Sequence, residues 1–260
     1  MNRTSQFLLL ILSLPGFLFA QANYQPGVTV DLKGDTIHGY INYREWESNP
    51  KSISFKTSAN GAPVTLRAGD IRYFSVQVGH LAEYISYKGP ISTDNTNTTL
   101  NHISVGRDTS FVEEVVFLKV VHEGKNLVLL SYTDEQKVRF YIAANLNSLP
   151  SELVYRVYYN SIEENGRDRT VSENTYKGQL YDAAVKSGAM TGSLKDKIKN
   201  AGYAEDNIVE IASAINGISA TDLTKNNPTK PKVVNKTIAI IGGLAVLVGL
   251  VIEFASIKSR

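Results

Sequence analysis

The sequence contains no cysteine among its 260 residues and no marked excess of charge of either sign. Without cysteine the chain can form no disulfide, hold no metal or iron–sulfur cluster through thiolates, and use no thiol nucleophile. Its 27 Lys and Arg residues nearly balance 25 Asp and Glu residues, whereas a general nucleic-acid-binding protein would show a basic excess. We therefore expect no nucleic-acid partner.

The sequence also lacks the common catalytic and cofactor motifs. It contains no phosphate-binding glycine-rich loop, no dinucleotide-binding glycine set and no Gly-x-Ser-x-Gly elbow. The four histidines are scattered: His38, His80, His102 and His122. Neighbouring Glu113 and Glu114 would point to opposite faces of a strand, which favours strand-edge charges over a catalytic pair. We expect no catalytic residue, cofactor or metal from these patterns.

Residues 1–20 have the features of a secretory signal. Arg3 precedes an apolar run over 7–19, and Ala20 is the expected cleavage point. As a helix, the apolar run would rise only about 20 Å, which is too short to cross a bilayer core.

A second apolar run, 237–257, has the length of a transmembrane helix, about 31 Å. We expect it to stop transfer and to leave a cytoplasmic tail at 258–260. Its small residues are spaced by four, a pattern that allows close helix–helix contact and self-association. These residues are Ala239, Gly243, Ala245 and Gly249.

The segment 221–236 before this run is rich in Lys, Pro and Asn and is expected to be a tether. Its lysines either contact anionic lipid or belong to a solvated linker. They oppose the expected orientation under the positive-inside rule, but a leading signal usually fixes the side that is translocated first.

Strand patterns dominate 21–160. Alternating segments 28–32 and 36–43 flank Gly34, which predicts a hairpin. Segments 71–78 and 83–87 are expected to pair, and 115–121, 127–132 and 138–142 form a predicted meander. Several segments are apolar on both faces, which indicates a covered sheet, either curled or closed into a small barrel. Segment 153–158 is a candidate edge strand.

The pattern changes to helical spacing within 161–220. Three apolar stripes predict three short helices that pack on one another or on the sheet. The stripes are Tyr176, Leu180 and Ala184; Leu194 and Ile198; and Ile208, Ile211 and Ile215. The predicted fold class is α+β: an antiparallel β-rich domain, a helical subdomain beginning at 161, and one C-terminal transmembrane helix.

Trp46 is the single tryptophan, and it lies between two predicted strands with Tyr43 and Arg44 nearby. An exposed Trp beside Arg and Tyr would suit contact with a carbohydrate, a peptide or a protein. In the alternative, the Trp46 ring folds back and closes one end of the sheet.

A set of short matches along 24–216 resembles a family of uncharacterised secreted and envelope proteins of Bacteroidota. The matching residues are 34–41, Trp46, 49–50, Ile53, 55–56, 70–71, Phe74, 117–142 and 176–180. Many relatives carry an outer-membrane β-barrel after this region, where the present chain has one apolar run. The resemblance implies a cell-envelope location and supplies no catalytic residue.

Together these observations predict a membrane-anchored envelope protein, with its N-terminal domain in the periplasm and its helix in the inner membrane of a Gram-negative bacterium. The expected role is non-catalytic binding or scaffolding, with the lipid bilayer and an envelope protein or glycan as partners. Two alternatives remain, a hydrolase acting on cell-wall or glycan material and a membrane-tethered signalling partner.

Overall fold

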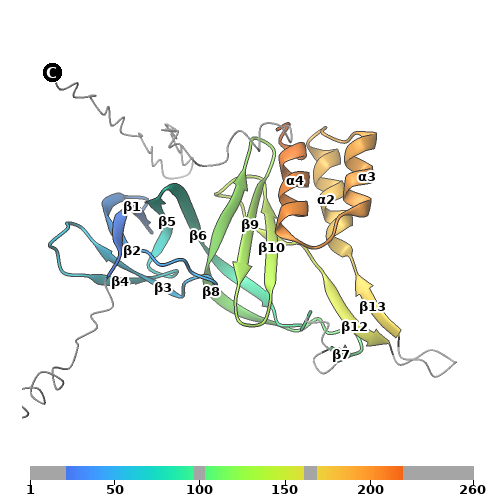
Figure 1. Cartoon of the computed structure of the whole chain (residues 1–260), viewed down its shortest axis with the longest axis horizontal. Helices are drawn as coiled ribbons and strands as arrows, with labels where there is room; N and C mark the ends of the chain where they lie inside the picture. The colour runs from blue at the N-terminus through green and yellow to red at the C-terminus, as the bar shows by residue number, and fades with distance from the viewer. Residues whose placement is uncertain (1–21, 97–102, 161–168, 219–260) are drawn as a thin grey trace, which may run out of the picture.

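The computed structural model describes residues 22–96, 103–160 and 169–218. It is β-rich, with a large antiparallel sheet and three short helices (Figure 1), as the sequence predicts. The strands of the large sheet are β1 (Tyr24–Asp31), β2 (Thr36–Asn42), β3 (Ser52–Lys56), β4 (Val64–Arg67), β5 (Ile71–Val78), β6 (His80–Ser92), β8 (Phe111–Glu123), β9 (Val128–Thr133), β10 (Val138–Ala143) and β11 (Ser151–Glu152). A smaller sheet contains β7 (Ser104–Val105), β12 (Arg156–Asn160) and β13 (Arg169–Glu173).

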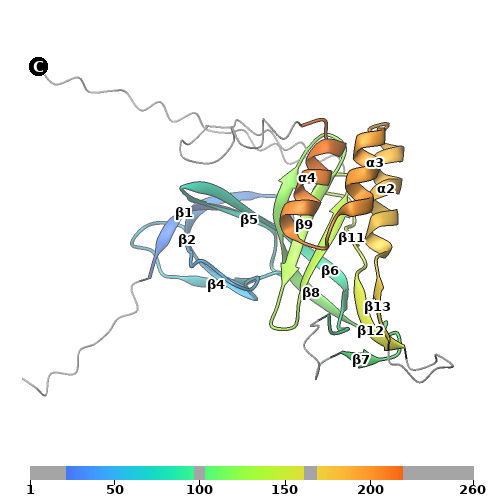
Figure 2. The same cartoon turned by 45° about the vertical axis from the view of Figure 1, so that its right-hand side comes forward.

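The order of the large sheet is β11-β10-β9-β8-β6-β5-β1-β2-β3-β4. Although β1, β2 and β3 separate β4 from β5 in this order, the chain passes from Arg67 at the end of β4 to Ile71 at the start of β5. Four peptide steps span at most about 14 Å, so this end of the sheet must curl on itself. Figure 2 shows the resulting ring. Side chains including Ile41, Phe55 and Phe74 fill it.

The predicted hairpin at Gly34 is confirmed. Gly34 has a positive φ of 98°, a conformation that glycine adopts without a steric cost. The Asp31 carboxylate accepts hydrogen bonds from the backbone N–H groups of Lys33, Gly34 and Asp35. Asp31 thereby fixes the turn, and β1 and β2 pair from Tyr24 opposite Asn42 to Val30 opposite Thr36.

The predicted pairing of 71–78 with 83–87 and the predicted three-stranded meander are also present. Several strands are longer than predicted, and two of the extensions lie next to each other. β6 continues through Gly89 and Pro90 to Ser92, and β8 begins at Phe111, four residues before the predicted start. The end of β6 and the start of β8 pair with each other, and this paired segment is absent from the predicted meander.

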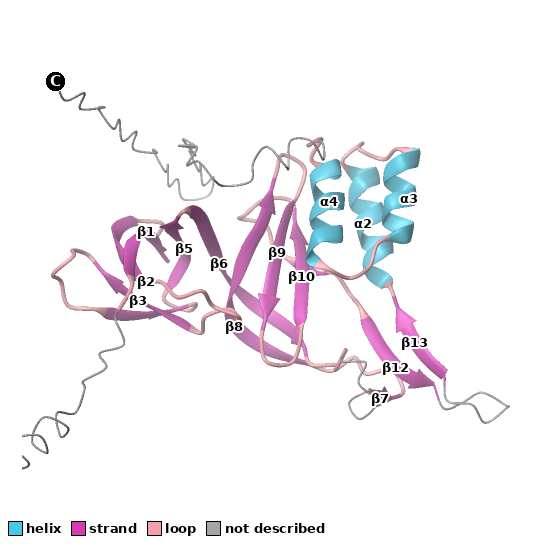
Figure 3. Ribbon diagram, in the orientation of Figure 1, coloured by secondary structure: helices cyan, strands magenta, loops and turns pink. Residues whose placement is uncertain are grey.

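The three helices are α2 (Thr175–Lys186), α3 (Gly192–Asn200) and α4 (Glu205–Ile215), and all three predicted apolar stripes are buried. Figure 3 shows the helices gathered at the β9–β10 end of the sheet. They share one hydrophobic cluster with Leu129 and Phe140 of these strands. Tyr203, between α3 and α4, joins the layers, because its hydroxyl accepts from the Phe140 N–H and donates to the Leu153 carbonyl.

The expected domain boundary at 160–161 falls inside a strand hairpin. β12 pairs with β13 from Arg156 opposite Glu173 to Asn160 opposite Arg169. The helices that follow pack on the same core as β9 and β10, which is one of the two arrangements that the sequence allows for them.

Several sequence predictions concern residues outside the described ranges: the signal at 1–20, the tether at 221–236 and the transmembrane helix at 237–257. Ala239, Gly243, Ala245 and Gly249, the candidate helix–helix contacts, are among them. Across 22–96, 103–160 and 169–218, no helix has both the length and the apolar character that a membrane span requires.

Candidate binding site on strand β8

The first half of β8 is exposed, although it lies within a long strand pair. β6 pairs with β8 along Phe111 to Lys119, but β9 pairs with β8 only from Lys119 to Glu123. The five residues from Phe111 to Val115 are all exposed, and Phe111 retains 59% of its accessible surface. In the described part of the chain, no strand pairs with the second edge of this segment.

Asn49 lies at the point where β9 separates from β8. Its side-chain amide donates to the carbonyl of Phe117 at 2.7 Å and to the carbonyl of Ser131 at 3.1 Å. Its backbone N–H donates to the Thr133 carbonyl, and its side-chain oxygen accepts from the Thr133 N–H. Asn49 therefore completes the hydrogen bonding of both strands where their pairing ends.

The backbone groups that face the open edge can be identified by parity. Successive residues of a strand direct their N–H and C=O groups to opposite edges. The Phe117 carbonyl faces Asn49 and not β6, so Phe111, Glu113 and Val115 also face away from β6.

Two observations on β6 agree with this assignment. Pro90 lies opposite Glu113 and has no N–H to donate, as expected for a pair that is not hydrogen-bonded. The Thr93 N–H donates to the Ser110 carbonyl at 3.0 Å, so Ser110 faces β6. By alternation, Val112 and Glu114 also face β6 and form the hydrogen-bonded pairs. Within the described residues, the outward N–H and C=O groups of Phe111, Glu113 and Val115 have no hydrogen-bond partner.

A shallow cleft of about 460 Å³ lies beside this segment. Its apolar lining comes from Tyr87, Pro90, Phe111, Leu149 and Pro150. Its charged lining comes from Glu113, Glu152 and Arg156. Leu149 retains 80% of its accessible surface.

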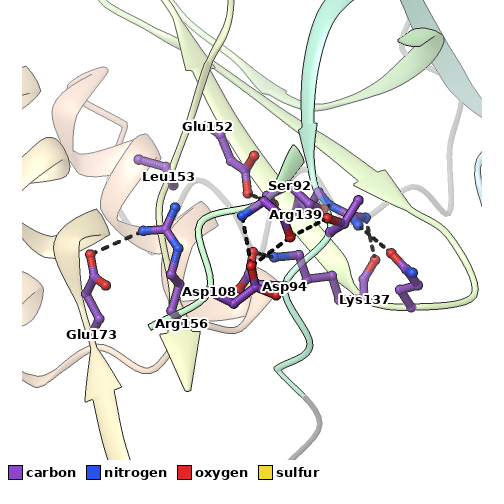
Figure 4. A network of polar contacts seen from close by, with 12 residues as sticks. Ser92, Asp94, Asp108, Lys137, Arg139, Glu152, Leu153, Arg156 and Glu173 are labelled. Atoms are coloured by element: carbon purple, nitrogen blue, oxygen red, sulfur yellow. Dashed lines mark hydrogen bonds and ion pairs between the residues drawn. The ribbon is translucent and has the colours of Figure 1, made fainter. Parts of the chain in front are cut away.

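The described residues that line the cleft carry a net negative charge, with two carboxylates, Glu113 and Glu152, against one cation, Arg156. Arg156 donates to a Glu173 carboxylate oxygen at 3.2 Å (Figure 4), and Arg107 makes two further contacts with this carboxylate at 2.7 and 2.8 Å. The Arg107 contact is the main cause that lowers the pKa of Glu173 to about 2. Glu113 and Glu152 are therefore the negative charges of the cleft lining that are available to an incoming ligand.

Two ion pairs lie near Ser92, which is one of the residues that line the cleft. Lys137 and Asp94 contact each other at 2.6 Å, with both side chains 4% exposed, and burial lowers the pKa of Lys137. Arg139 donates to the Ser92 carbonyl at 2.8 Å and contacts Asp134 at 3.0 Å. Ser92 in turn donates to the Glu152 carboxylate, which ties the end of β6 to β11.

The structure brings together two of the three residues predicted as a surface contact. The rings of Tyr43 and Trp46 lie 4.8 Å apart, edge to face, and the Trp46 ring also contacts Phe74 and Tyr84 of the ring core. Trp46 is half-buried, which agrees with the alternative that it closes one end of the sheet, whereas Arg44 is exposed.

Sequence reasoning treated Glu113 and Glu114 as strand-edge charges and did not identify the site that they mark. Both are exposed on β8, as that interpretation requires. The sequence signal for this site is an acidic pair between apolar residues. The open edge itself depends on a contact between Asn49 and Phe117, which are 68 residues apart in the sequence. Among the described residues, no three His, Asp or Glu side chains form a potential metal site.

Comparisons with protein-family models, curated proteins and solved structures found no match to this chain.

Proposed function

We propose that this chain is a membrane-anchored envelope protein whose folded part binds or scaffolds another envelope component without catalysis. The observation that carries the binding role is the open edge of β8 at Phe111 to Val115, next to the cleft. An exposed strand edge with unpaired N–H and C=O groups is a ready template for pairing with another chain. Natural proteins usually cover or shorten such edges, so a long exposed one indicates a contact surface.

The location rests on the sequence. The signal-like segment 1–20 and the apolar run 237–257 support export followed by anchoring. The resemblance to secreted and envelope proteins of Bacteroidota points in the same direction. The bilayer and an envelope protein are the partners we propose.

A hydrolase acting on cell-wall or glycan material is the second candidate, because Glu113 and Glu152 line the same cleft. Glu152, however, already accepts a hydrogen bond from Ser92. Glu113→Gln and Glu152→Gln variants would each abolish hydrolysis of purified peptidoglycan if these carboxylates were catalytic. Loss of activity in both would replace the binding role with an enzymatic one.

Site-specific photo-crosslinking in cells tests the binding role. A photoreactive residue at Val115, which is 46% exposed on β8, is compared with one at Val185, which is 51% exposed on α2. We expect a discrete crosslinked product from Val115 and none of comparable yield from Val185. Equal yields, or no product at Val115, would contradict the proposal.

A topology reporter tests the location separately. Alkaline phosphatase fused after residue 236 is active only when it is exported. We expect an active fusion that fractionates with membranes when 237–257 follows it. An inactive cytoplasmic fusion would overturn the assigned topology.

A further inference from the structure

We infer that the ligand of the β8 site is an extended peptide segment with two adjacent basic residues between apolar ones, which adds to the sheet as a strand beside Phe111–Val115. This inference rests on the proposed binding function and specifies its ligand. Three properties of the site support it: the direction of the backbone groups, the sign of the charge, and the shape of the cleft.

The backbone geometry favours a strand over other ligands. Phe111, Glu113 and Val115 direct their N–H and C=O groups to the open edge, spaced two residues apart. An added β-strand supplies donors and acceptors with the same spacing, as in other cases of β-strand addition. A small ligand or a helix would leave most of these groups unpaired.

The corresponding edge of β6 is protected at two positions, Pro90 and Ser92. Pro90 has no N–H, and its carbonyl accepts from the Tyr87 hydroxyl at 3.4 Å. The Ser92 carbonyl accepts from Arg139. Proline and inward side-chain contacts are common means of protecting a strand edge, and β8 has neither over this segment.

The charges of Glu113 and Glu114 determine which kind of strand can pair with this edge. In antiparallel pairing of two copies through this segment, Glu113 of one copy would lie opposite or next to Glu113 or Glu114 of the other. Like charges placed directly opposite each other destabilise a strand pair, whereas opposite charges stabilise it. A second copy of this chain is therefore disfavoured, and a strand with basic residues opposite Glu113 and Glu114 is favoured.

The cleft adds specificity on one face. Side chains alternate along β8, so a residue opposite Glu113 projects on the cleft face and its neighbour opposite Glu114 projects on the other face. Phe111 and Leu149 offer apolar contact, and Glu113 and Glu152 offer negative charge. A Lys or Arg side chain has a matching apolar stem and charged end.

The test uses the full-length chain in mild detergent and a labelled, end-capped peptide, Thr-Val-Lys-Lys-Val-Thr. A control peptide replaces both lysines with glutamate. We expect the basic peptide to bind at least about tenfold more tightly at low salt. The difference should shrink as added salt screens exposed charges.

Two N-methylated forms of the basic peptide distinguish strand addition from simple charge attraction. One form is methylated at the odd positions and the other at the even positions. A strand presents only one of these sets to β8, so one form should lose about tenfold or more in affinity and the other should retain it. Equal affinity of the two forms would overturn the strand geometry.

A charge reversal locates the site. The double variant Glu113→Lys with Glu114→Lys should prefer the acidic peptide, and the double variant with glutamine at both positions should lose most of the preference for the basic peptide, because only Glu152 of the cleft keeps its charge. The matched control is Asp182→Lys with Asp196→Lys, which changes the net charge of the protein by the same amount at two exposed helical residues. This control should keep the preference for the basic peptide. A reversed preference in the control would place binding elsewhere.

Failure of this inference and failure of the proposed function give different results. If Val115 crosslinks to a partner but the basic peptide shows no preference, the binding role stands and the ligand class is wrong. If neither occurs, the binding role itself fails.

Discussion

Asn49 and Thr133 exchange two hydrogen bonds: the Asn49 N–H donates to the Thr133 carbonyl at 2.8 Å, and the Asn49 side-chain oxygen accepts from the Thr133 N–H at 3.0 Å. The side-chain nitrogen of Asn49 reaches Phe117 on β8. One residue between β2 and β3 thus fixes where β9 leaves β8. Beyond this point, among the strands that the structure describes, β8 keeps only its β6 neighbour, and the open edge begins.

Replacing Asn49 should lower the free energy of unfolding more than replacing an exposed asparagine does. Asn49→Ala leaves the Phe117 carbonyl and the Thr133 N–H without these partners, so we expect a loss of about 2 kcal/mol in the free energy of unfolding. Urea denaturation measures the change. Asn147→Ala, at an exposed site, should change stability by less than about 0.5 kcal/mol. Similar losses in the two variants would show that Asn49 has no special role.

Gly124 and Asn216 should behave as a coupled pair. The Asn216 side chain bonds both the N–H and the C=O of Leu127, and a Cβ on Gly124 would lie 2.1 Å from the Asn216 Cγ. Gly124→Ala should therefore cost about 2 kcal/mol through overpacking.

A double-mutant cycle checks this coupling. Asn216→Ala should cost less in the Gly124→Ala background than in the wild-type protein, by about 1 kcal/mol. Gly178→Ala is the control, because a Cβ there meets no atom within 4 Å, and it should not destabilise α2. Strict additivity of the first two changes would argue against the close contact.

The buried pair Lys137 and Asp94 should show asymmetric mutational effects. Lys137→Met leaves the Asp94 carboxylate buried without its cation, and we expect a loss of about 3–5 kcal/mol. Adding Asp94→Leu removes the unpaired charge and should recover most of that loss. Lys125→Met, at an exposed turn, is the control. A double variant as unstable as Lys137→Met alone would mean that packing, not charge, dominates.

Glu173 should make stability depend on acid pH. Contacts with Arg107 hold its pKa at about 2 in the folded protein, against an ordinary value of 4.5. Because the folded-state pKa is depressed, the stabilisation is complete above 4.5 and is lost as the pH falls toward 2. The difference in unfolding free energy between wild type and Glu173→Gln, followed by denaturation from neutral pH downward, should shrink over this interval. A difference that does not vary with pH would refute the assignment.

Local patterns predicted the elements that local forces determine. The Gly34 hairpin needs a residue that tolerates positive φ, and the helical stripes at Tyr176, Leu194 and Ile208 follow from burial of one face. These features depend on neighbours within a few residues, so the sequence reveals them.

Features that depend on distant contacts were not accessible in this way. The strands β4, β7 and β13 are short, and β7 pairs in parallel with β12, more than fifty residues away in the sequence. The start of β8 was missed because the Glu113–Glu114 pair interrupts the apolar pattern. The open edge depends on Asn49, and the acidity of the cleft depends on the meeting of Glu113 from β8 with Glu152 from β11.

Residue-resolved amide hydrogen exchange of the free protein tests the open edge of β8 most directly. We expect an alternating pattern: fast exchange at Glu113 and Val115, and slow exchange at Val112, Glu114 and Val116, whose N–H groups face β6. Uniform protection across this segment would show that the edge is already covered. Uniformly fast exchange would show that the β6–β8 pairing does not extend to Phe111.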